Sequence, residues 1–441
     1  MSAKIGEFRN VKSLFAADRK ETEELLIRAT RDIPFEPVEG DGAIVRDRYG
    51  NEYLDFHSFV GTANVGHGRI PVLWQPGKIL NALPNDFLSV PARQLAEKLI
   101  QITPIRGDKK KVLFRSSGTQ AVEAALKLSM AHHHFNPRES QSPFCIGHFT
   151  NSFHGRTLGS LSITDSKREI RRKYFPVLDW VLYVPIPFPQ CFEIRGVIPE
   201  NASHDRCWNS WHEELERTNP GFMERVHELH VLFMELVQGE GGINPICPRV
   251  LDYFAGECAK EGVVIVVDEV QTGIGRTGEM FACDAYGFKP DIITMAKSLA
   301  LGMPLSAVVA NIEYDEDGLD ADTFGGFTLA AQVALSVLDA VPIELERLKQ
   351  ENSFQIIEQV LSGFDRTLVR DVRGLGMMFG FDIEGVRGDA RRQLIDRSLE
   401  QGLVLIGAGR NAIRVMPPLA ITKEELEMGL DIMENVIQKL S

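Results

Sequence analysis

The chain has 441 residues, of which 44% are hydrophobic and 25% charged, and its formal net charge is −13. This length and apolar content can bury a large core divided among more than one structural unit. The acidic balance argues against a nucleic-acid binder, because such proteins usually present a basic surface to the phosphate backbone. We find no apolar run that suits a membrane span and no secretory signal, so we expect a cytoplasmic protein without a membrane partner.

The N-terminal segment is expected to hold a helix at about residues 20–30. Short strands follow in GAIVRDRYGNEYLDF, residues 42–56, with a hairpin turn over residues 48–51.

From about residue 90 the pattern alternates between helices and short apolar strands. Helices are expected at residues 120–135 and 250–261. Strands are expected at residues 111–115, 144–149, 230–237, 263–267, 291–295 and 305–310. Short β-branched strands with helices between them are typical of a mainly parallel sheet covered on both faces. The polar stretch 190–228 is expected to be an insertion or a long loop with some helix.

The composition shifts after about residue 343 to a smaller α+β unit. Strands are expected in GLGMMFGFDI, residues 374–383, and NAIRVMPPL, residues 411–419. The last helix begins with Thr422 and Glu425 at the spacing of a capping box. We therefore divide the chain into three parts: an N-terminal segment (1–70), a large domain (71–342) and a small C-terminal domain (343–441).

Cysteines and a histidine tract are where a metal site would be sought. The six cysteines stand at positions 145, 191, 207, 247, 258 and 283, and no two of them form C-x-x-C. The run His132, His133 and His134 has no second ligand cluster beside it, so we expect a solvated helix end there. The pattern predicts no metal site and reduced thiols.

The stretch Gly273–Gly278 has the G-x-G-x-x-G spacing of a dinucleotide-binding loop. Such a loop follows its strand directly and opens a long helix. Here Asp268 and Glu269 stand between the strand and the glycines, where carboxylates would repel a pyrophosphate. We expect the glycines to shape a tight loop and no dinucleotide to bind there.

Charged residues at two strand ends are the stronger signal. Asp268 ends the strand 263–267 and, if buried, needs an arginine, a metal or a protonated ring nitrogen as partner. Lys297 follows the strand 291–295 and is either a solvated charge or an amine held for Schiff-base chemistry. Together they fit a pyridoxal cofactor, which needs a lysine for its aldehyde and a carboxylate for its pyridinium nitrogen.

The cofactor's phosphate would suit the start of the helix at 120–135. The stretch Ser116-Ser117-Gly118-Thr119 joins a strand to that helix, and the N–H groups at a helix start attract anions. These residues could also be a simple helix cap, and the two roles are compatible.

Eight motifs, in order along nearly the whole chain, resemble those of the class III (ω-amino) pyridoxal-phosphate aminotransferases. They are YGNEYLDF with NVGHG, SSGTQAVEAALKL, SFHGRTLGSLS, ELVQGEGG, VVDEVQTGIGRTGEMFA, DIITMAKSLALGMPLSAVV, TFGG and IRVMPPL. The resemblance implies an α/β fold of the fold-type I transferases, with a mostly parallel seven-stranded sheet flanked by helices and a smaller α+β C-terminal domain. It also implies pyridoxal 5'-phosphate as cofactor.

The resemblance implies roles for three residues around the reactive atoms. Lys297 would bind the cofactor aldehyde and then move the proton between substrate carbon and cofactor. Asp268 would keep the pyridine nitrogen protonated, and Gln271 would reach the phenolic oxygen.

It also implies contacts with the ring faces and the phosphate. Val270 and Phe153 would cover the two ring faces, although core packing is the alternative role for Phe153. Residues at the helix start would hold the phosphate: Ser117, Gly118 and Thr119. Thr323 would reach the phosphate of a partner subunit, which implies a homodimer with shared sites, unless it is an ordinary turn hydroxyl.

The substrate residues implied by the resemblance are two arginines and a glutamate. Arg156 would take the distal carboxylate of 2-oxoglutarate and Arg414 the α-carboxylate, because guanidinium binds carboxylate with two hydrogen bonds. Glu240 would neutralise Arg414 when an ω-amine donor has no α-carboxylate. Structural ion pairs are the alternative for all three.

The run SITDSKREIRRKYFPVLDWVLYVPIPFP resembles the 4-aminobutyrate and lysine ε-aminotransferase branch, so we expect transfer from 4-aminobutyrate to 2-oxoglutarate, giving succinate semialdehyde and glutamate. Ornithine δ- or lysine ε-transamination is the alternative. The family's usual G-G-N-P-L is Gly325-Gly326-Phe327-Thr328-Leu329 here, which leaves the substrate preference open. An amino-acid racemase would share the cofactor residues but has no need of Arg156, and a non-catalytic pyridoxal-binding scaffold and a nicotinamide dehydrogenase fit less well.

Overall fold

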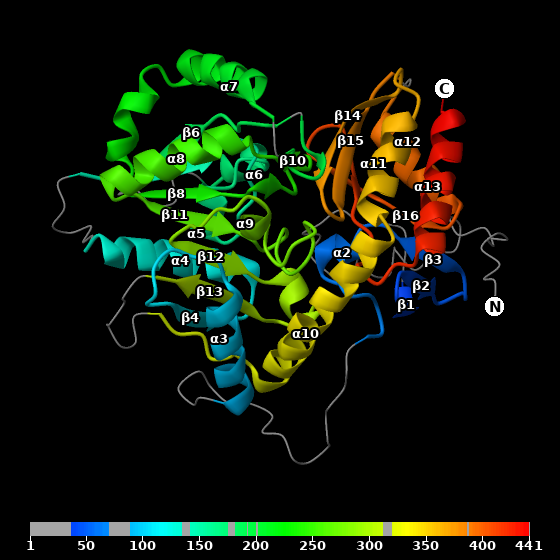
Figure 1. Cartoon of the computed structure of the whole chain (residues 1–441), viewed down its shortest axis with the longest axis horizontal. Helices are drawn as coiled ribbons and strands as arrows, with labels where there is room; N and C mark the ends of the chain where they lie inside the picture. Colours follow the sequence, from blue (N-terminus) through cyan, green and yellow to red (C-terminus); the bar gives the residue numbers. More distant parts are fainter. Residues whose placement is uncertain are drawn as a thin grey trace.

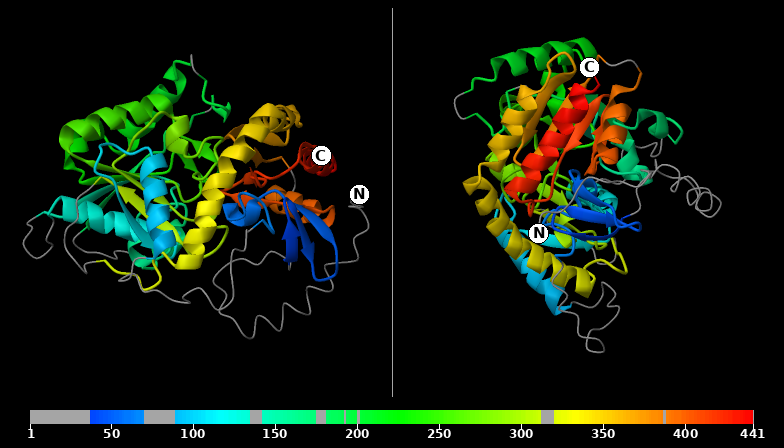
Figure 2. Two further views of the ribbon diagram at one scale, coloured as in Figure 1. Left: turned by 60° about the horizontal axis from the view of Figure 1, so that its bottom comes forward. Right: turned by 90° about the vertical axis from the view of Figure 1, so that its right-hand side faces the viewer.

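The computed structural model describes residues 37–69, 89–134, 142–174, 181–191, 193–199, 202–311, 320–385 and 388–440. The helix expected at residues 20–30 lies outside them. A large part and a smaller part lie side by side, and helix α10 (Thr328–Gln350) runs from one to the other (Figures 1 and 2).

The large part is built on a seven-stranded sheet of order β4-β13-β12-β11-β8-β5-β6. The strands are β4 (Lys111–Arg115), β5 (Phe144–Phe149), β6 (Val181–Ile186), β8 (Val231–Met234), β11 (Val264–Asp268), β12 (Ile292–Met295) and β13 (Ser306–Ala310). Only β13 runs antiparallel to its neighbours, and the other pairs are parallel. The predicted mostly parallel seven-stranded sheet is confirmed.

The strand sequences explain why both faces of this sheet are covered. Every residue of β8, β11, β12 and β13 is buried, as expected of apolar runs without a polar face. Successive side chains of β11 alternate between two core clusters: Val264 and Val266 pack with α4 (Gly118–His132), and Ile265 and Val267 join the cluster that includes α8 (Pro248–Glu261). These two helices match the predictions for residues 120–135 and 250–261.

The other helices of the large part are α3 (Val90–Ile102), α5 (Leu158–Ser162), α6 (Arg168–Arg171), α7 (Asp205–Thr218), η1 (Phe222–Glu228), α9 (Ala282–Ala285) and η2 (Lys297–Ala300). The stretch 190–228 contains α7 and η1, as the expected insertion with some helix. It also contains β7 (Arg195–Gly196), which pairs with a sheet of the smaller part. Strands β9 (Val237–Gln238) and β10 (Asn244–Pro245) form a separate antiparallel pair.

The N-terminal strands pack beside the C-terminal part of the chain. Strands β1 (Pro37–Asp41), β2 (Ile44–Asp47) and β3 (Glu52–Asp55) form an antiparallel meander, and β3 pairs in parallel with β16 (Leu403–Val404). The predicted hairpin turn at 48–51 is confirmed, since the Asp47 carboxylate accepts the N–H groups of Tyr49 and Asn51. Figure 2 shows the meander, in blue, next to the C-terminal elements.

The smaller part is built on a five-stranded sheet of order β17-β18-β15-β14-β7. Its C-terminal elements are α11 (Ser353–Gly363), β14 (Val369–Leu375), β15 (Met378–Ile383), α12 (Ala390–Glu400), β17 (Ile406–Ala408), β18 (Ala412–Val415) and α13 (Lys423–Gln438). The predicted capping box is present: Thr422 Oγ1 accepts the N–H of Glu425 at 3.2 Å, and Glu425 Oε2 accepts that of Thr422 at 2.9 Å.

Helix α10 crosses the predicted domain boundary at 342/343, and Pro342 lies inside it. Our expectation that no run suits a membrane span needs one correction, because among the described helices α10 has the length and apolarity of a span. Half of its apolar window is buried inside the structure, with Val337, Leu338 and Val341 in the main core cluster. This burial is that of a core helix between the two parts.

Candidate active site

The carboxyl ends of the parallel strands meet at one edge of the seven-stranded sheet, where open α/β sheets bind ligands. Five segments lie at this edge: residues 116–119 after β4, 150–157 after β5, 235–242 after β8, 268–271 at the end of β11 and 296–297 after β12. All sequence-predicted site residues except Thr323 and Arg414 stand on these segments. The topology therefore collects them at a single edge.

Asp268, the last residue of β11, is 5% exposed and held from several sides. Its Oδ2 lies 2.9 Å from Nδ1 of His154, and its Oδ1 accepts the N–H of Val270 at 3.0 Å and the hydroxyl of Thr294 at 3.3 Å. Thr294 is in register with Asp268 on the neighbouring strand β12. These contacts orient a buried carboxylate, as pairing with a protonated ring nitrogen requires.

Lys297 follows β12 and begins the short helix η2. Burial lowers the pKa of its amine from the ordinary value, Asp268 partly opposes this shift, and Arg414 adds to the lowering. The negative charges of Glu235 and Glu240 also oppose the lowering of this pKa. A lysine with a lowered pKa is more often neutral, and the neutral amine is the form that attacks an aldehyde.

Val270 packs closely against Gly118 at the start of α4. A Cβ atom added to Gly118 would come within 2.9 Å of Val270 Cγ1 and 3.4 Å of Ala296 Cβ. Phe153 is half-buried after β5, and its N–H donates to Glu235 Oε1 at 2.9 Å. The side chains predicted to cover the ring therefore both lie in loops at the sheet edge.

Gln271 packs against the loop that carries Glu240. A Cβ atom at Gly239 would overlap Gln271 Oε1, at 1.3 Å, so only glycine fits there. A Cβ atom at Gly61 would lie 3.9 Å from both Gln271 Cγ and Lys297 Cδ. The turn α2 (Ser58–Gly61) therefore borders the site from the N-terminal segment.

This turn has an unusual backbone. Ser58, Phe59 and Val60 have φ angles of 49°, 46° and 61°, a left-handed conformation that costs energy for residues with a side chain. Hydroxyl groups hold it at both ends: Ser58 Oγ donates to Met416 O at 2.7 Å, and Ser298 Oγ donates to Gly61 O at 2.7 Å. Sequence reasoning did not find this turn, because non-glycine residues rarely adopt it.

The start of α4 suits an anion. Ser117 is the N-cap residue but gives no side-chain cap, because its Oγ donates to Gln120 Oε1 at 3.0 Å. The first N–H groups of this 15-residue helix thus receive no side-chain acceptor from Ser117, and the helix dipole favours negative charge there. Thr119 Oγ1 lies 2.8 Å from Thr157 Oγ1 and 2.6 Å from Ser160 Oγ.

Thr323 is exposed in the turn 323–326, and the neighbouring Phe324 is 58% exposed. This turn lies beside the end of β4, since Ser116 Oγ donates to Asp322 Oδ2 at 2.7 Å. The place of Thr323 across a dimer interface stays a prediction.

Arg414 and Glu240 form an ion pair, as the resemblance implied, and Glu240 has a second partner, Lys167. Arg414, on β18, is 2% exposed and also donates to Gly407 O. Burial alone would raise the pKa of Glu240, but Arg414 and Lys167 overcome this effect and hold it below the ordinary value. The two cations therefore share one carboxylate.

Arg156 differs from Arg414 in both its exposure and its pairing. It is exposed, and among the described residues it makes no ion pair. Its guanidinium carbon lies 5.9 Å from the ring centre of Phe153, within the range of a cation–π contact. This arginine is available to a carboxylate that arrives from outside.

Sequence reasoning missed three polar neighbours of the site: His154, Lys167 and Glu235. His154 and Lys167 stand inside motifs used for the resemblance, but their partners lie far away in sequence. Glu235 accepts the N–H groups of Phe153 and Gly239, and burial raises its pKa to about 7. A glutamate directly after an apolar strand was the available signal.

The glycine stretch 273–278 lies in a loop of turns between the two parts, as predicted. Arg276, fully buried, donates to Met377 O at 3.1 Å, Pro417 O at 2.6 Å and Ser58 Oγ at 3.0 Å. A Cβ atom at Gly275 would meet Val341 Cγ1 at 2.7 Å. The glycines thus allow close packing around a buried arginine, and the absence of a dinucleotide stays a prediction.

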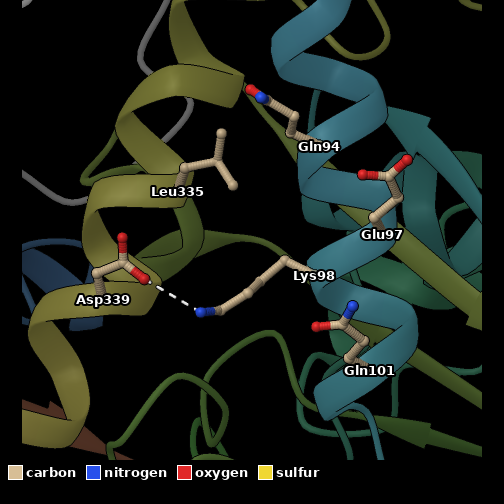
Figure 3. Close-up of a pocket in the computed structure, with 6 residues that line it drawn as sticks. All are labelled: Gln94, Glu97, Lys98, Gln101, Leu335 and Asp339. Atoms are coloured by element: carbon tan, nitrogen blue, oxygen red, sulfur yellow. Dashed lines mark hydrogen bonds and ion pairs between the residues drawn. The ribbon is translucent and has the colours of Figure 1, made fainter.

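An open hollow between α3 and α10 lies apart from this site. Its lining is Gln94, Glu97, Lys98, Gln101, Leu335 and Asp339 (Figure 3). Lys98 Nζ donates to Asp339 Oδ1 at 3.1 Å, and none of the predicted site residues lines the hollow.

The arrangement at the sheet edge fits pyridoxal phosphate. Asp268 ends β11, Lys297 follows the neighbouring strand β12, Val270 packs so closely on Gly118 that a Cβ there would clash, and the start of α4 has no side-chain cap. When bound, this cofactor supplies the electron sink that amino transfer needs. The polypeptide supplies the amine, the carboxylate and the anion site that such a group requires.

A profile of the family described as Aminotransferase class-III matches residues 27–437. The chain is 32% identical over 417 residues to an acetylornithine aminotransferase of Lactococcus lactis subsp. lactis, covering 92% of this chain and 97% of that protein. It is 30% identical over 438 residues to an acetylornithine/succinyldiaminopimelate aminotransferase of Photorhabdus laumondii subsp. laumondii, covering 98% and 100%.

Solved structures have the same fold as this chain. An acetylornithine aminotransferase from Elizabethkingia anophelis has a TM-score of 0.73 at 25% identity, covering 98% of this chain and 100% of that one. An ornithine aminotransferase from Toxoplasma gondii ME49 shares the fold, with a TM-score of 0.79 at 23% identity over 98% and 96%. The fold is that of a fold-type I pyridoxal-phosphate enzyme, and the chain belongs to the class III aminotransferases.

The predicted fold class, cofactor and aminotransferase activity are confirmed at the level of the family. The finer resemblance to 4-aminobutyrate aminotransferases is not supported, because the relatives above are acetylornithine aminotransferases. Sequence motifs around the cofactor are shared across the family, and they identify the class better than the donor.

Proposed function

We propose that this protein transfers the amino group of an ω-amino donor, whose single carboxylate lies far from the reacting amine, to 2-oxoglutarate. The observation that carries this proposal is the different state of the two arginines. Arg414 is neutralised by Glu240, whereas the exposed Arg156 makes no ion pair among the described residues. A donor with one distal carboxylate needs one free arginine, and an α-amino acid would leave Glu240 in its way.

The cofactor residues divide the chemistry between them. Lys297 would bind the aldehyde of the cofactor and carry the proton, and Asp268, oriented by His154, would keep the pyridine nitrogen protonated. Gln271 would contact the phenolic oxygen, and Val270 and Phe153 would cover the ring. Residues at the start of α4 would hold the phosphate: Ser117, Gly118 and Thr119. The burial of Asp268 and the lowered pKa of Lys297 support these assignments.

Two donors have a single carboxylate far from the reacting amine and no free α-amine. In acetylornithine the α-amine is acylated and the δ-amine is free, and in 4-aminobutyrate no α-amine exists. The relatives' names favour acetylornithine, and the run around Lys167 favours 4-aminobutyrate. Ornithine and lysine keep a charged α-ammonium beside the carboxylate, which places a second positive charge near Arg156 and makes them weaker donors.

The same proposal includes a homodimer with shared sites in the cytoplasm. Thr323 would contact the phosphate held by the partner subunit, and the exposed Phe324 would be covered there. The six free cysteines agree with a reducing compartment. Sedimentation of the holoenzyme tests the dimer: Phe324→Asp should shift it towards the monomer, and a monomeric wild-type protein would refute shared sites.

The experiment is a donor panel with 2-oxoglutarate as acceptor, read as glutamate formed. We expect acetylornithine and 4-aminobutyrate to give the highest kcat/KM, and ornithine, lysine and alanine to give lower values. Glutamate formation from an α-amino acid alone, or racemisation without glutamate, would refute the proposal. Butylamine, which has no carboxylate, is the matched control for 4-aminobutyrate.

A further inference from the structure

At a distance from the active-site edge of the seven-stranded sheet, the segment that contains β7 extends from the large part to the smaller part and then returns. Strand β7 pairs in parallel with β14, through Arg195 with Gly374 and Gly196 with Leu375. Before β7, the backbone is bonded to β10 and to the N-cap residue of α8: Cys191 N donates to Pro245 O at 2.8 Å, and Cys247 N donates to Pro189 O at 2.7 Å. After β7, helix α7 brings the chain back over the large part (Figure 1).

The two ends of this segment, before and after β7, bring metal-ligating side chains together. Cys191 Sγ lies 3.5 Å from His204 Nδ1 and 3.7 Å from Cys207 Sγ. The three residues are 0%, 6% and 1% exposed, and Cys247, also buried, lies within hydrogen-bond reach of Cys207. Three buried cysteines and a histidine at one point are a donor set of the kind that binds zinc.

A carboxylate completes the cluster. Glu193 Oε2 is a buried atom that lies 2.9 Å from His204 Nδ1, and the Glu193 side chain as a whole is 34% exposed. The ligand atoms of Cys191, Glu193 and His204 all lie within 4.8 Å of one another. A cation between these groups would replace the direct contact between Glu193 and His204.

Two of the distances between ligand atoms match a tetrahedral ion, and the 2.9 Å between His204 Nδ1 and Glu193 Oε2 would have to widen to about 3.3 Å. Zinc–sulfur distances of about 2.3 Å and zinc–nitrogen distances of about 2.0 Å separate two sulfur ligands by roughly 3.8 Å, and sulfur from nitrogen by roughly 3.5 Å. The sulfur–sulfur and sulfur–nitrogen distances around Cys191 are 3.7 and 3.5 Å. Cys207 lies outside the group of three whose ligand atoms are all within 4.8 Å of one another, so its sulfur would have to move towards Glu193 and His204 to become the fourth ligand.

We propose that Cys191, Glu193, His204 and Cys207 bind one structural Zn²⁺ ion, with Cys247 hydrogen-bonded to Cys207 behind it. The site is distinct from the amino-transfer site and does not depend on its chemistry. Its spacing, Cys191-x12-His204-x2-Cys207, lacks C-x-x-C, which is why the sequence analysis expected no metal. The fold, not the local spacing, assembles the donors.

The ion would hold together the two ends of the segment that carries β7. Four side chains of the protein around one ion leave no open position, which is typical of a structural rather than a catalytic zinc site. Pro245, which receives the Cys191 N–H, belongs to β10, and the β9–β10 turn carries Glu240. Loss of zinc should therefore loosen β7 from β14 and lower the melting temperature of the holoenzyme.

The test is the zinc content of the full-length holoenzyme, produced in zinc-supplemented medium and desalted, measured by inductively coupled plasma mass spectrometry. We expect about one zinc per chain for the wild type and about one for Cys145→Ser, a cysteine of β5 outside the cluster. Cys191→Ser and His204→Gln should each retain less than about a tenth of it. Wild-type protein without zinc, or zinc retained equally in all variants, would overturn the proposal.

Two further measurements test the zinc site even if a variant fails to fold. Cobalt exchanged into the wild type should give the absorption bands of thiolate-bound, tetrahedral cobalt, and a spectrum without thiolate bands would overturn the proposal. Thiol titration of the denatured, chelated protein should count six free thiols. A count of four without zinc would instead indicate a Cys191–Cys207 disulfide.

Discussion

Nδ1 of His154 lies 2.9 Å from Oδ2 of Asp268, and both side chains are almost fully buried. Asp268 ends β11 and His154 follows β5, so the contact spans two strands of the sheet and the one between them. The histidine therefore orients the carboxylate that, in the proposed function, would pair with the cofactor's pyridine nitrogen.

Removing this histidine should weaken amino transfer without removing any group that touches the substrate. We expect His154→Phe to lower kcat/KM about 10- to 150-fold, the equivalent of the 1.5–3 kcal/mol of a hydrogen bond to a charged group. His154→Asn, which can still donate, should keep more of the activity. The cofactor dissociation constant should rise in the same order, and an unchanged value in His154→Phe would contradict a positioning role.

Replacing Glu240 should change which amino donor the enzyme prefers. In Glu240→Ala the guanidinium of Arg414 becomes free for an α-carboxylate, so kcat/KM for glutamate as donor should rise relative to that for acetylornithine or 4-aminobutyrate. A shift of roughly tenfold or more in this ratio is expected for the loss of a charge-assisted contact. Equal losses with all donors would mean that the glutamate is only structural.

Lys167 competes with Arg414 for the same carboxylate. In Lys167→Met, Glu240 should stay with Arg414, so that the α-carboxylate of 2-oxoglutarate meets a blocked arginine. We expect the KM for 2-oxoglutarate to rise several-fold, with a much smaller change for the ω-amino donor. Lys173→Met, an exposed lysine in the same segment, is the matched control. Equal effects of the two substitutions would argue against this role.

The buried Glu235 predicts a pH dependence of stability. Burial raises its pKa to about 7 in the folded protein, whereas it is about 4.3 in an unfolded chain. The folded state therefore holds the proton more tightly. This contribution to stability is complete below the unfolded pKa and is lost as the pH rises through about 7, by about 1.4 kcal/mol per pH unit across the window.

Glu235→Gln cannot ionise, so the comparison isolates this group. The unfolding free energy of the wild type minus that of the variant should fall between pH 5 and pH 8, measured by denaturant titration. Glu213→Gln, at an exposed position of α7, should give a difference independent of pH. A flat difference for Glu235→Gln as well would show that its pKa is not raised.

The sequence was sufficient for six strands of the seven-stranded sheet and for the residues that end them, but β6 (Val181–Ile186) was not among the predicted strands. Parallel strands must end at the same edge, so the strand assignments alone bring Asp268 and Lys297 together. The same logic covers Gly118 and Glu240. The helices α4, α8 and α13 followed from their apolar spacing and, for α13, from its capping box.

Contacts between distant segments could not be predicted in this way. Arg276 joins Ser58, Met377 and Pro417, and no periodicity marks which carbonyl groups a buried arginine will meet. Lys167 looked like one charge in a basic run, and only the tertiary structure brings it to Glu240. The scattered positions of Cys191 and Cys207 likewise carry no motif.

The central claim is that Arg156 receives the distal carboxylate of an ω-amino donor. The most direct test is the rate at which 4-aminobutyrate and butylamine bleach the visible band of the lysine-bound cofactor, without acceptor, in the wild type and in Arg156→Gln. We predict a wild-type preference for 4-aminobutyrate of about 10- to 150-fold that collapses towards one in Arg156→Gln, and recovery of the band with 2-oxoglutarate in the wild type. A preference that survives the substitution would contradict the account.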